Sequence, residues 1–188
     1  SATVRSRLRL GSDCDRLTRI WSIFGKVRYD DSGEQIFRSM AQLVDSEPSR
    51  AGIVGYARPL ASYAAERVLW QEGIEAPTLD RHLISGVCDD SMWVRVARAV
   101  AGLHRTSLDL PPSITRDSLQ AEIQRAAATL IVAAPSSAPA VDTLCARLQA
   151  RIGGIDCSPG ATLHGDLHSK NILVGPDRIH LIDLDRLG

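Results

Sequence analysis

The C-terminal part of the chain contains the stretch that decides the fold: Leu163-His164-Gly165-Asp166-Leu167-His168-Ser169-Lys170-Asn171-Ile172-Leu173-Val174, followed by Ile179-His180-Leu181-Ile182-Asp183-Leu184-Asp185. Two apolar runs, 172–174 and 179–182, flank the turn-forming residues 175–177, Gly-Pro-Asp, so we expect them to pair as a β-hairpin. Such a hairpin would bring Asn171 and Asp183 together near Asp166. Amide and carboxylate oxygens are ligands that Mg²⁺ prefers. With a further carboxylate beside them, they are typical of a phosphoryl-transfer site.

The spacing of the polar residues in this stretch resembles that of a known family. The pattern H-G-D-x-x-x-x-N from His164 to Asn171, followed by I-D-x-D, is similar to the aminoglycoside phosphotransferase and choline kinase group, which is related to the protein kinases. The resemblance implies that Asp166 is the catalytic base on the substrate hydroxyl. It also implies that Asn171 and Asp183 hold Mg²⁺. The competing interpretation is an Asp-rich loop beside an ordinary hairpin.

Two departures from the protein kinases indicate a small-molecule acceptor. Gly165 stands where protein kinases usually have the arginine that receives an activation-loop phosphate, so that phosphate switch is missing. Leu184 and Asp185 replace the Phe-Gly that follows the metal-binding aspartate. Asp185 is either a further metal ligand or a cap for the next segment. His164 and His168 could serve as bases or zinc ligands, but hydrogen bonds that brace the loop fit this irregular stretch better.

Length and composition narrow the class of protein. The chain has 188 residues and no formal net charge, which gives no reason to expect nucleic acid or a membrane surface as partner. No apolar run is long enough to cross a bilayer, and the first residues lack a signal-peptide core. The four cysteines show no C-x-x-C spacing, so reduced thiols in a cytoplasmic protein are expected. They are Cys14, Cys88, Cys145 and Cys157.

Both ends of the sequence resemble interior positions of a longer protein. The chain begins without methionine in a strand-like segment, and it stops soon after Asp183. Members of the family have a glycine-rich hairpin before the corresponding start and a helical segment after the corresponding end. We therefore expect the chain to be the middle part of a longer protein, and we expect residues 1–188 alone not to turn over substrate.

Alternating apolar residues predict two strands near the N-terminus, at residues 3–10 and 17–29. Period two places Phe24 and Lys26 on one face of the second strand. The resemblance makes Lys26 the strand lysine that holds the α- and β-phosphates of the nucleotide. The alternative is a surface lysine on an edge strand.

Apolar residues at helical spacing predict a helix over residues 34–44. In kinase-like folds a helix at this place supplies a glutamate that pairs with the strand lysine. Glu34 is the acid in this helix that could do so. Its place in the first turn equally suits a residue that only stabilises the helix dipole.

Two short apolar strands follow, at residues 53–57 and 67–72, and Gly73 and Pro77 then interrupt the pattern. This order resembles the hinge between kinase lobes. Adenine would bind there through main-chain groups near Gln71, Glu72 and Ile74. An ordinary loop between a strand and a helix is the alternative.

Helical periodicity dominates from residue 91 onward, with helices expected near 91–104, 116–133 and 141–152. The first should be capped by Asp90 or Ser91. Strands followed by helices and one hairpin predict an α+β fold with two lobes. We place a β-rich nucleotide-binding lobe at residues 1–74 and a mainly helical lobe at residues 75–188.

The sequence thus favours a kinase that uses ATP or GTP and Mg²⁺ to phosphorylate a hydroxyl group of a small molecule. An aminoglycoside, a sugar or an amino alcohol would fit as acceptor. One alternative is a nucleotide-binding module without turnover, a pseudokinase, and a less favoured one is a protein kinase. The sequence leaves the acceptor, the phosphate donor and the oligomeric state open.

Overall fold

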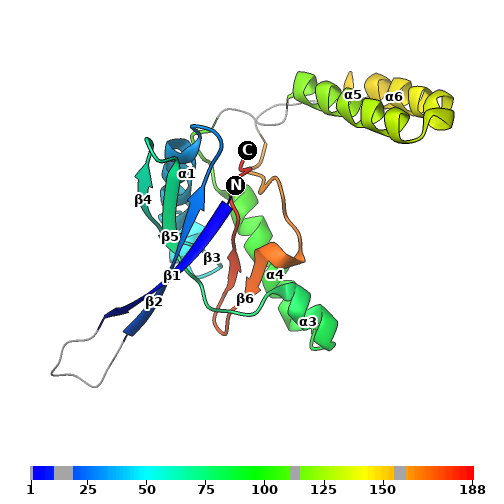
Figure 1. Ribbon diagram of the computed structural model, residues 1–188. Coiled ribbons are helices and arrows are strands. Elements are labelled where there is room, and N and C mark those ends of the chain that lie inside the picture. Colours follow the sequence, from blue (N-terminus) through cyan, green and yellow to red (C-terminus); the bar gives the residue numbers. More distant parts are fainter. Residues whose placement is uncertain (1, 11–18, 111–114, 155–159) are drawn as a thin grey trace. The chain divides into compact units, whose positions relative to one another are not determined.

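The computed structural model describes residues 2–10, 19–110, 115–154 and 160–188 (Figure 1). Residue contacts divide the chain into two compact units. Within the described ranges, the first unit, Ser1–Asp109 with Ala161–Leu187, contains two β-sheets and four α-helices, and the second, Leu110–Gly160, contains two α-helices. Lys26 and the polar residues of the C-terminal hairpin all belong to the first unit.

The larger sheet has four antiparallel strands in the order β1-β2-β5-β4. They are β1 (Ala2–Leu10), β2 (Arg19–Val27), β4 (Pro59–Tyr63) and β5 (Val68–Glu72). The strands expected at 3–10, 17–29 and 67–72 are confirmed, except that residues 17 and 18 lie outside the described residues. Strand β4 was not expected, since it begins with a proline and contains small residues. Lys26 lies opposite Thr3 on one side and Leu69 on the other, so β2 is an interior strand.

The smaller sheet contains the expected hairpin. Strand β6 (Ile172–Val174) pairs antiparallel with β7 (Ile179–Leu181), with Val174 opposite Ile179. Strand β3 (Val54–Tyr56) pairs parallel with β7. The strand expected at 53–57 therefore joins the C-terminal hairpin and not the larger sheet.

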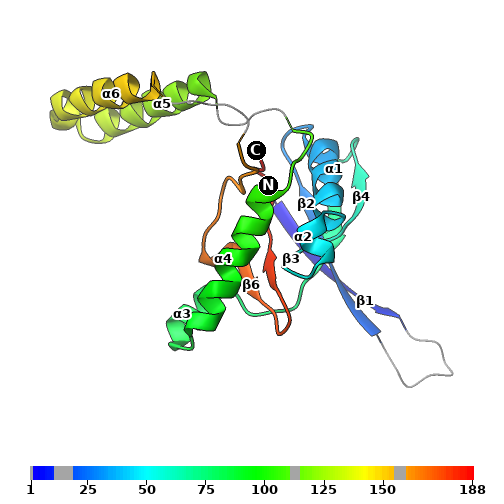
Figure 2. The same ribbon diagram turned by 180° about the vertical axis from the view of Figure 1, so that it is seen from behind.

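Four α-helices of the described chain belong to the first unit: α1 (Gly33–Val44), α2 (Glu47–Arg50), α3 (Leu79–Ser85) and α4 (Asp90–Arg105). Helix α3 lies at one end of α4 (Figure 2). Helix α4 begins one residue earlier than expected, because Asp89 is its cap and accepts a hydrogen bond from the amide of Met92 at 2.7 Å. One buried apolar cluster joins α1, α4 and the strands. Its most buried members are Leu43, Val54, Leu69, Ala99, Leu103, Ile179 and Leu181.

The second unit is a helical hairpin of α5 (Arg116–Ala133) and α6 (Ala138–Ile152), joined by a short 3₁₀ turn at Pro135–Ser137. Both helices were expected. Helix α5, which is described over its whole length, has no buried side chain. Among the described residues, none of the helices has the length and apolar character needed to span a bilayer.

Two of the four cysteines can be described. Cys88 and Cys145 are free thiols in the structure. Cys14 and Cys157 lie outside the described residues.

Candidate active site

The C-terminal hairpin sets Asn171 and Asp183 side by side. The amide of Ile182 donates to the main-chain oxygen of Asn171 at 3.0 Å, which closes the ladder next to both residues. Asp183 then adopts a left-handed backbone with φ of 62°. This conformation is unfavourable for a residue with a side chain and persists where the surroundings impose it, often at functional sites. Leu184, which is buried, fixes the chain on the far side of this turn.

Lys26 reaches from β2 into this turn, where it meets two carboxylates. Its Nζ lies 2.5 Å from Oδ1 of Asp183 and 3.1 Å from Oδ1 of Asp185. The lysine is 8% exposed, so the alternative of a surface lysine is wrong. Arg28 joins the same cluster, with Nη1 3.2 Å from Oδ2 of Asp185. The structure therefore unites the N-terminal strand lysine with the proposed metal ligand.

The charge of Lys26 keeps Asp183 ionised. Burial by itself would raise the pKa of the Asp183 carboxyl group. The hydrogen bond and positive charge of Lys26, with smaller contributions from His164 and His168, outweigh that effect and lower the pKa below its usual value. An ionised carboxylate is the form that binds a cation.

Asn171 is held by the loop that carries Asp166. Its side-chain nitrogen donates to the main-chain oxygen of Asp166 at 3.0 Å, and Asn171 is buried. This hydrogen bond fixes the orientation of the amide and leaves its oxygen for another partner. The side chain of Asp166 is exposed at the loop, as a group that meets a substrate must be.

Gly165 has a structural reason to be glycine. Its φ is 76°, and a Cβ atom added there would collide with the main-chain oxygen of Arg186. The arginine that protein kinases usually carry at this place therefore could not fit without moving the segment after Asp183.

The two histidines of the loop brace it, as expected. Nε2 of His164 donates to the main-chain oxygen of Ile182 at 2.8 Å, and His164 is buried. Burial is the main cause of its lowered pKa. Nδ1 of His168 accepts from the amide of Lys170 at 3.2 Å.

The expected pair between Lys26 and Glu34 is not formed. Glu34 accepts instead from Nε of Arg38 at 3.2 Å, one turn further along α1. The glutamate lies in the first, half-exposed turn of the helix, and Asp183 and Asp185 occupy the lysine. The sequence predicted that Glu34 lies in a helix, but it could not determine which side chain Glu34 contacts.

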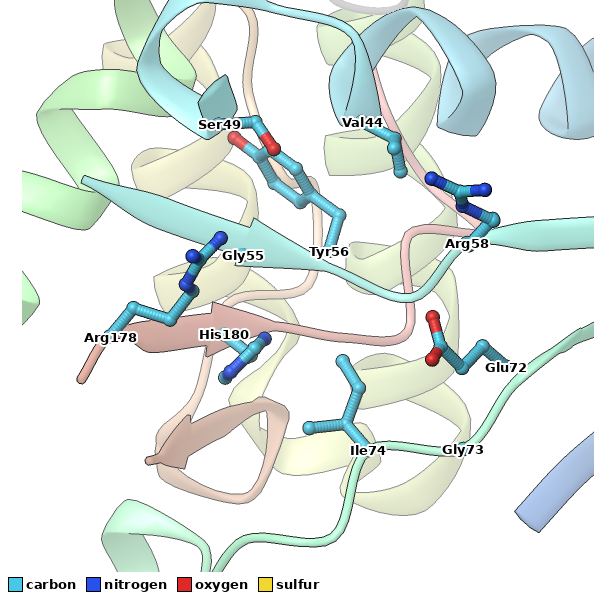
Figure 3. Close-up of a pocket in the computed structure, with 10 residues that line it drawn as sticks. All are labelled: Val44, Ser49, Gly55, Tyr56, Arg58, Glu72, Gly73, Ile74, Arg178 and His180. Atoms are coloured by element: carbon cyan, nitrogen blue, oxygen red, sulfur yellow. The ribbon is translucent and has the colours of Figure 1, made fainter. Parts of the chain in front are cut away.

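The residues expected at the hinge lie at the end of β5. Gln71 is buried, the amide of Glu72 donates to Arg58 at 2.8 Å, and the amide of Gly73 donates to Ser22 at 2.7 Å. Two hinge amides are thus already engaged. Glu72 and Ile74 line a pocket of about 310 Å³ together with Arg58, Tyr56 and His180 (Figure 3). Its lining does not include Lys26 or Asp183.

The oxygen atoms of Asp183 and Asn171 have the chemistry that Mg²⁺ prefers when it binds together with a nucleotide. No group of three His, Cys, Asp or Glu side chains among the described residues could hold a metal ion. Mg²⁺ is usually bound through one or two protein carboxylates together with phosphates and water. The ionised carboxylate of Asp183 and the oriented amide of Asn171 are a set of that kind.

Sequence reasoning left the role of Asp185 open and did not single out Arg28. The structure makes both of them part of the cluster around Lys26. Period two along β2 carries a signal for Arg28, because Lys26 and Arg28 are two residues apart and share a face.

Comparison with known proteins gives one family. The model of the phosphotransferase enzyme family matches residues 14–188. No curated protein matches the sequence.

Solved structures share the fold at low sequence identity. A choline/ethanolamine kinase family protein from Mesorhizobium loti has a TM-score of 0.60 at 16% identity, over 97% of this chain and 59% of its own. The choline kinase LicA from Streptococcus pneumoniae has a TM-score of 0.59 at 20% identity, over 97% and 64%. APH(2″)-IIa, in its ternary complex with streptomycin and ATP, has a TM-score of 0.57 at 13% identity, over 97% and 66%.

These likenesses confirm the expected two-lobed, kinase-like α+β fold. The chain spans 59% to 66% of the length of these three neighbours.

Proposed function

The chain belongs to the phosphotransferase enzyme family, and we propose that the protein moves the γ-phosphate of ATP or GTP to a hydroxyl group of a small molecule. The cluster of Lys26, Asp183 and Asn171 beside Asp166 carries this proposal. It combines a buried cation, an ionised carboxylate, an oriented amide and an exposed carboxylate. Phosphoryl transfer requires mainly this kind of positioning and charge neutralisation.

Each residue has a distinct role in the proposed reaction. Asn171 and Asp183 would hold Mg²⁺, which when bound neutralises charge on the phosphates. Lys26 would exchange its contact with Asp183 for the α- and β-phosphates. Asp166 would accept a hydrogen bond from the acceptor hydroxyl and take its proton as the bond to phosphorus forms.

The same proposal assigns a role to each of the two lobes and a binding site to the nucleotide. Residues 1–74 form the nucleotide-binding lobe and residues 75–188 the helical lobe with the catalytic loop. Adenine binds to main-chain groups near Gln71, Glu72 and Ile74. The two hinge amides already engaged by Arg58 and Ser22 leave carbonyl groups and the segment after Gly73 for this contact.

A small-molecule acceptor is favoured over a protein by the loop around Gly165. The close approach of Arg186 leaves no room there for the arginine that receives an activation-loop phosphate in protein kinases. Two of the structural neighbours are named as a choline kinase and a choline/ethanolamine kinase family protein, and a third is bound to streptomycin. Amino alcohols and aminoglycosides are therefore the first acceptors to test.

The test is phosphate transfer by the natural full-length protein, with ATP or GTP and Mg²⁺, to a panel of amino alcohols, sugars and aminoglycosides. For the accepted compound, Asp166→Asn should lower kcat by about 10²–10⁴-fold, the usual contribution of a positioned base. The matched control is Asp177→Asn, which alters an exposed aspartate in the hairpin turn and should leave kcat unchanged. Full activity in Asp166→Asn would remove Asp166 as the base.

A nucleotide-binding module without turnover is the second candidate. The observation that favours it is the ion pair between Lys26 and Asp183, which must open before both groups can serve a nucleotide and its metal. Mg²⁺-dependent nucleotide binding by the full-length protein, without a phosphorylated product from any acceptor in the panel, would support this candidate. Transfer to a protein but to no small molecule would instead indicate a protein kinase.

A further inference from the structure

Lys26 has two carboxylate partners, and only one of them can remain when the other is used by a metal. We propose that Asp185, and not Glu34 of helix α1, is the residue that positions Lys26 for the nucleotide phosphates. This inference rests on the proposed function, because it assigns the nucleotide phosphates to Lys26.

Asp185 is engaged through both of its oxygens. Oδ1 lies 3.1 Å from Nζ of Lys26, and Oδ2 lies 3.2 Å from Nη1 of Arg28. Its side chain is 20% exposed, whereas that of Asp183 is 45% exposed. Asp185 therefore joins two cations at the end of β2, and Asp183 is the carboxylate that an incoming ligand can reach.

The path of the chain after β7 allows Asp183 and Asp185 to have different roles. Asp183 turns the backbone through a left-handed conformation, and Leu184 inserts its side chain into the core. The core contact of Leu184 holds the segment in place, so Asp185 is fixed two residues beyond Asp183 and faces the same lysine.

Glu34 is poorly placed for the same task. Its carboxylate contacts Arg38 at 3.2 Å, in a pair between exposed side chains of one helix. Such pairs contribute little to stability, and this contact engages Glu34 with a residue of its own helix. A buried lysine without a carboxylate partner is costly, and Asp185 supplies that partner in the first unit of the chain.

When a nucleotide binds, the two aspartates separate in function. Asp183 would be the residue that holds the metal, while Asp185 would keep the lysine ammonium group and Arg28 in place. Asp185 acts through Lys26 and is a positioning residue. It does not touch the transferred phosphate.

The two lysines of the sequence, Lys26 and Lys170, permit a test that needs no turnover. Lys26 is buried and paired, whereas Lys170 is exposed. The full-length protein without nucleotide is treated briefly with acetic anhydride, and the acetylation of each lysine is measured by mass spectrometry. The ratio of Lys26 to Lys170 labelling should rise several-fold in Asp185→Asn and stay at the wild-type value in Glu34→Gln.

Two further variants keep the test decisive if Asp185→Asn folds poorly. Arg28→Gln leaves both aspartates in place but releases the second oxygen of Asp185, so it should raise the labelling ratio by a smaller factor. Asp185→Glu retains the charge on a longer stem and should return the ratio toward the wild-type value. A ratio that rises in Glu34→Gln and stays unchanged in the Asp185 and Arg28 variants would overturn the proposal.

A kinetic measurement then links the positioning to the nucleotide. Asp185→Asn should raise the KM for the nucleotide on the order of tenfold, as expected when a buried charge loses its partner, with a smaller effect on the KM for the acceptor. If the wild type transfers no phosphate but the labelling pattern holds, the proposed function fails and the positioning of Lys26 stands. If the wild type is active and Asp185→Asn matches it in labelling and in KM, the positioning fails and the function stands.

Discussion

At the scale of single residues, the left-handed backbone at Gly165 ties the loop that carries Asp166 to the segment after Asp183. The structure offers a matched pair of glycines for measuring this constraint. Gly86, at the end of α3, has φ of 69° and open space where a Cβ atom would lie, whereas Gly165 has φ of 76° and meets the main chain of Arg186. The two sites share the backbone conformation and differ in the collision.

We expect Gly86→Ala to lower the free energy of unfolding by about 1–2 kcal/mol, the cost of a left-handed conformation for a residue with a Cβ atom. Gly165→Ala should cost more, because the main chain of Arg186 must also move. It should in addition reduce phosphate transfer, since Asp166 is the next residue. Chemical denaturation and the acceptor assay measure the two effects. Equal stabilities of the two variants would show that the approach of Arg186 is not a constraint.

His164 gives the protein a pH dependence of known sign. Burial lowers the pKa of His164 from its ordinary value of 6.5, so below pH 6.5 the unfolded chain binds a proton at this residue that the folded chain does not. Stability from this residue is therefore present above pH 6.5 and is lost as the pH falls below it. The slope for one proton is at most about 1.4 kcal/mol per pH unit.

We expect His164→Gln to flatten this part of the curve. The glutamine amide can still donate to the main-chain oxygen of Ile182, but it does not titrate. The measurement is the free energy of unfolding between pH 5 and pH 7 for both proteins, by denaturant titration. A wild-type slope that persists unchanged in the variant would assign the pH dependence to other groups, such as His180, whose pKa is also lowered by burial.

At the scale of elements, the hairpin of β6 and β7 is fixed at its turn by helix α4. Arg95 donates through Nη2 to the main-chain oxygen of Gly175 at 2.6 Å and to that of Pro176 at 3.3 Å. Arg95→Ala should lower the free energy of unfolding by about 1–3 kcal/mol, as expected for hydrogen bonds from a charged donor. The control is Arg98→Ala on an exposed position of the same helix. If both variants have the stability of the wild type, the turn does not depend on this contact.

Some of the helices and strands could be predicted from the sequence, and others could not. The hairpin was predictable, because its strands are adjacent, its turn has a clear Gly-Pro signal and its polar residues follow a family spacing. The parallel pairing of β3 with β7 was not predictable, because the two strands are far apart in the sequence and no local pattern indicates that they pair. Strand β4 was hidden by Pro59 at its start and by the small residues within it.

The candidate site, too, could be predicted from the sequence only in part. The pattern around Asp166, Asn171 and Asp183 is contiguous and could be read directly. The partner of Lys26 depends on how α1 packs against the larger sheet, which periodicity does not determine. The sequence therefore favoured Glu34, whereas the structure places Asp185 at the lysine.

At the scale of the whole molecule, the two units differ in how they are stabilised. All the described members of the buried apolar cluster lie in the first unit, among residues 36–108 and 172–187. In the second unit, α5 has no buried side chain along its described length. The folding of the first unit should therefore not depend on the helical hairpin.

We expect replacement of residues 111–159 by a flexible Gly/Ser linker to leave the first unit folded. Its thermal unfolding and its Mg²⁺-dependent nucleotide binding should match those of the parent protein, because the apolar cluster and the groups around Lys26 remain complete. Leu181→Ala in the parent protein is the contrasting variant. It removes a fully buried side chain and should cost about 2–5 kcal/mol. A linker variant that is as unstable as Leu181→Ala would show that the helical hairpin is part of the same cooperative unit as the two sheets.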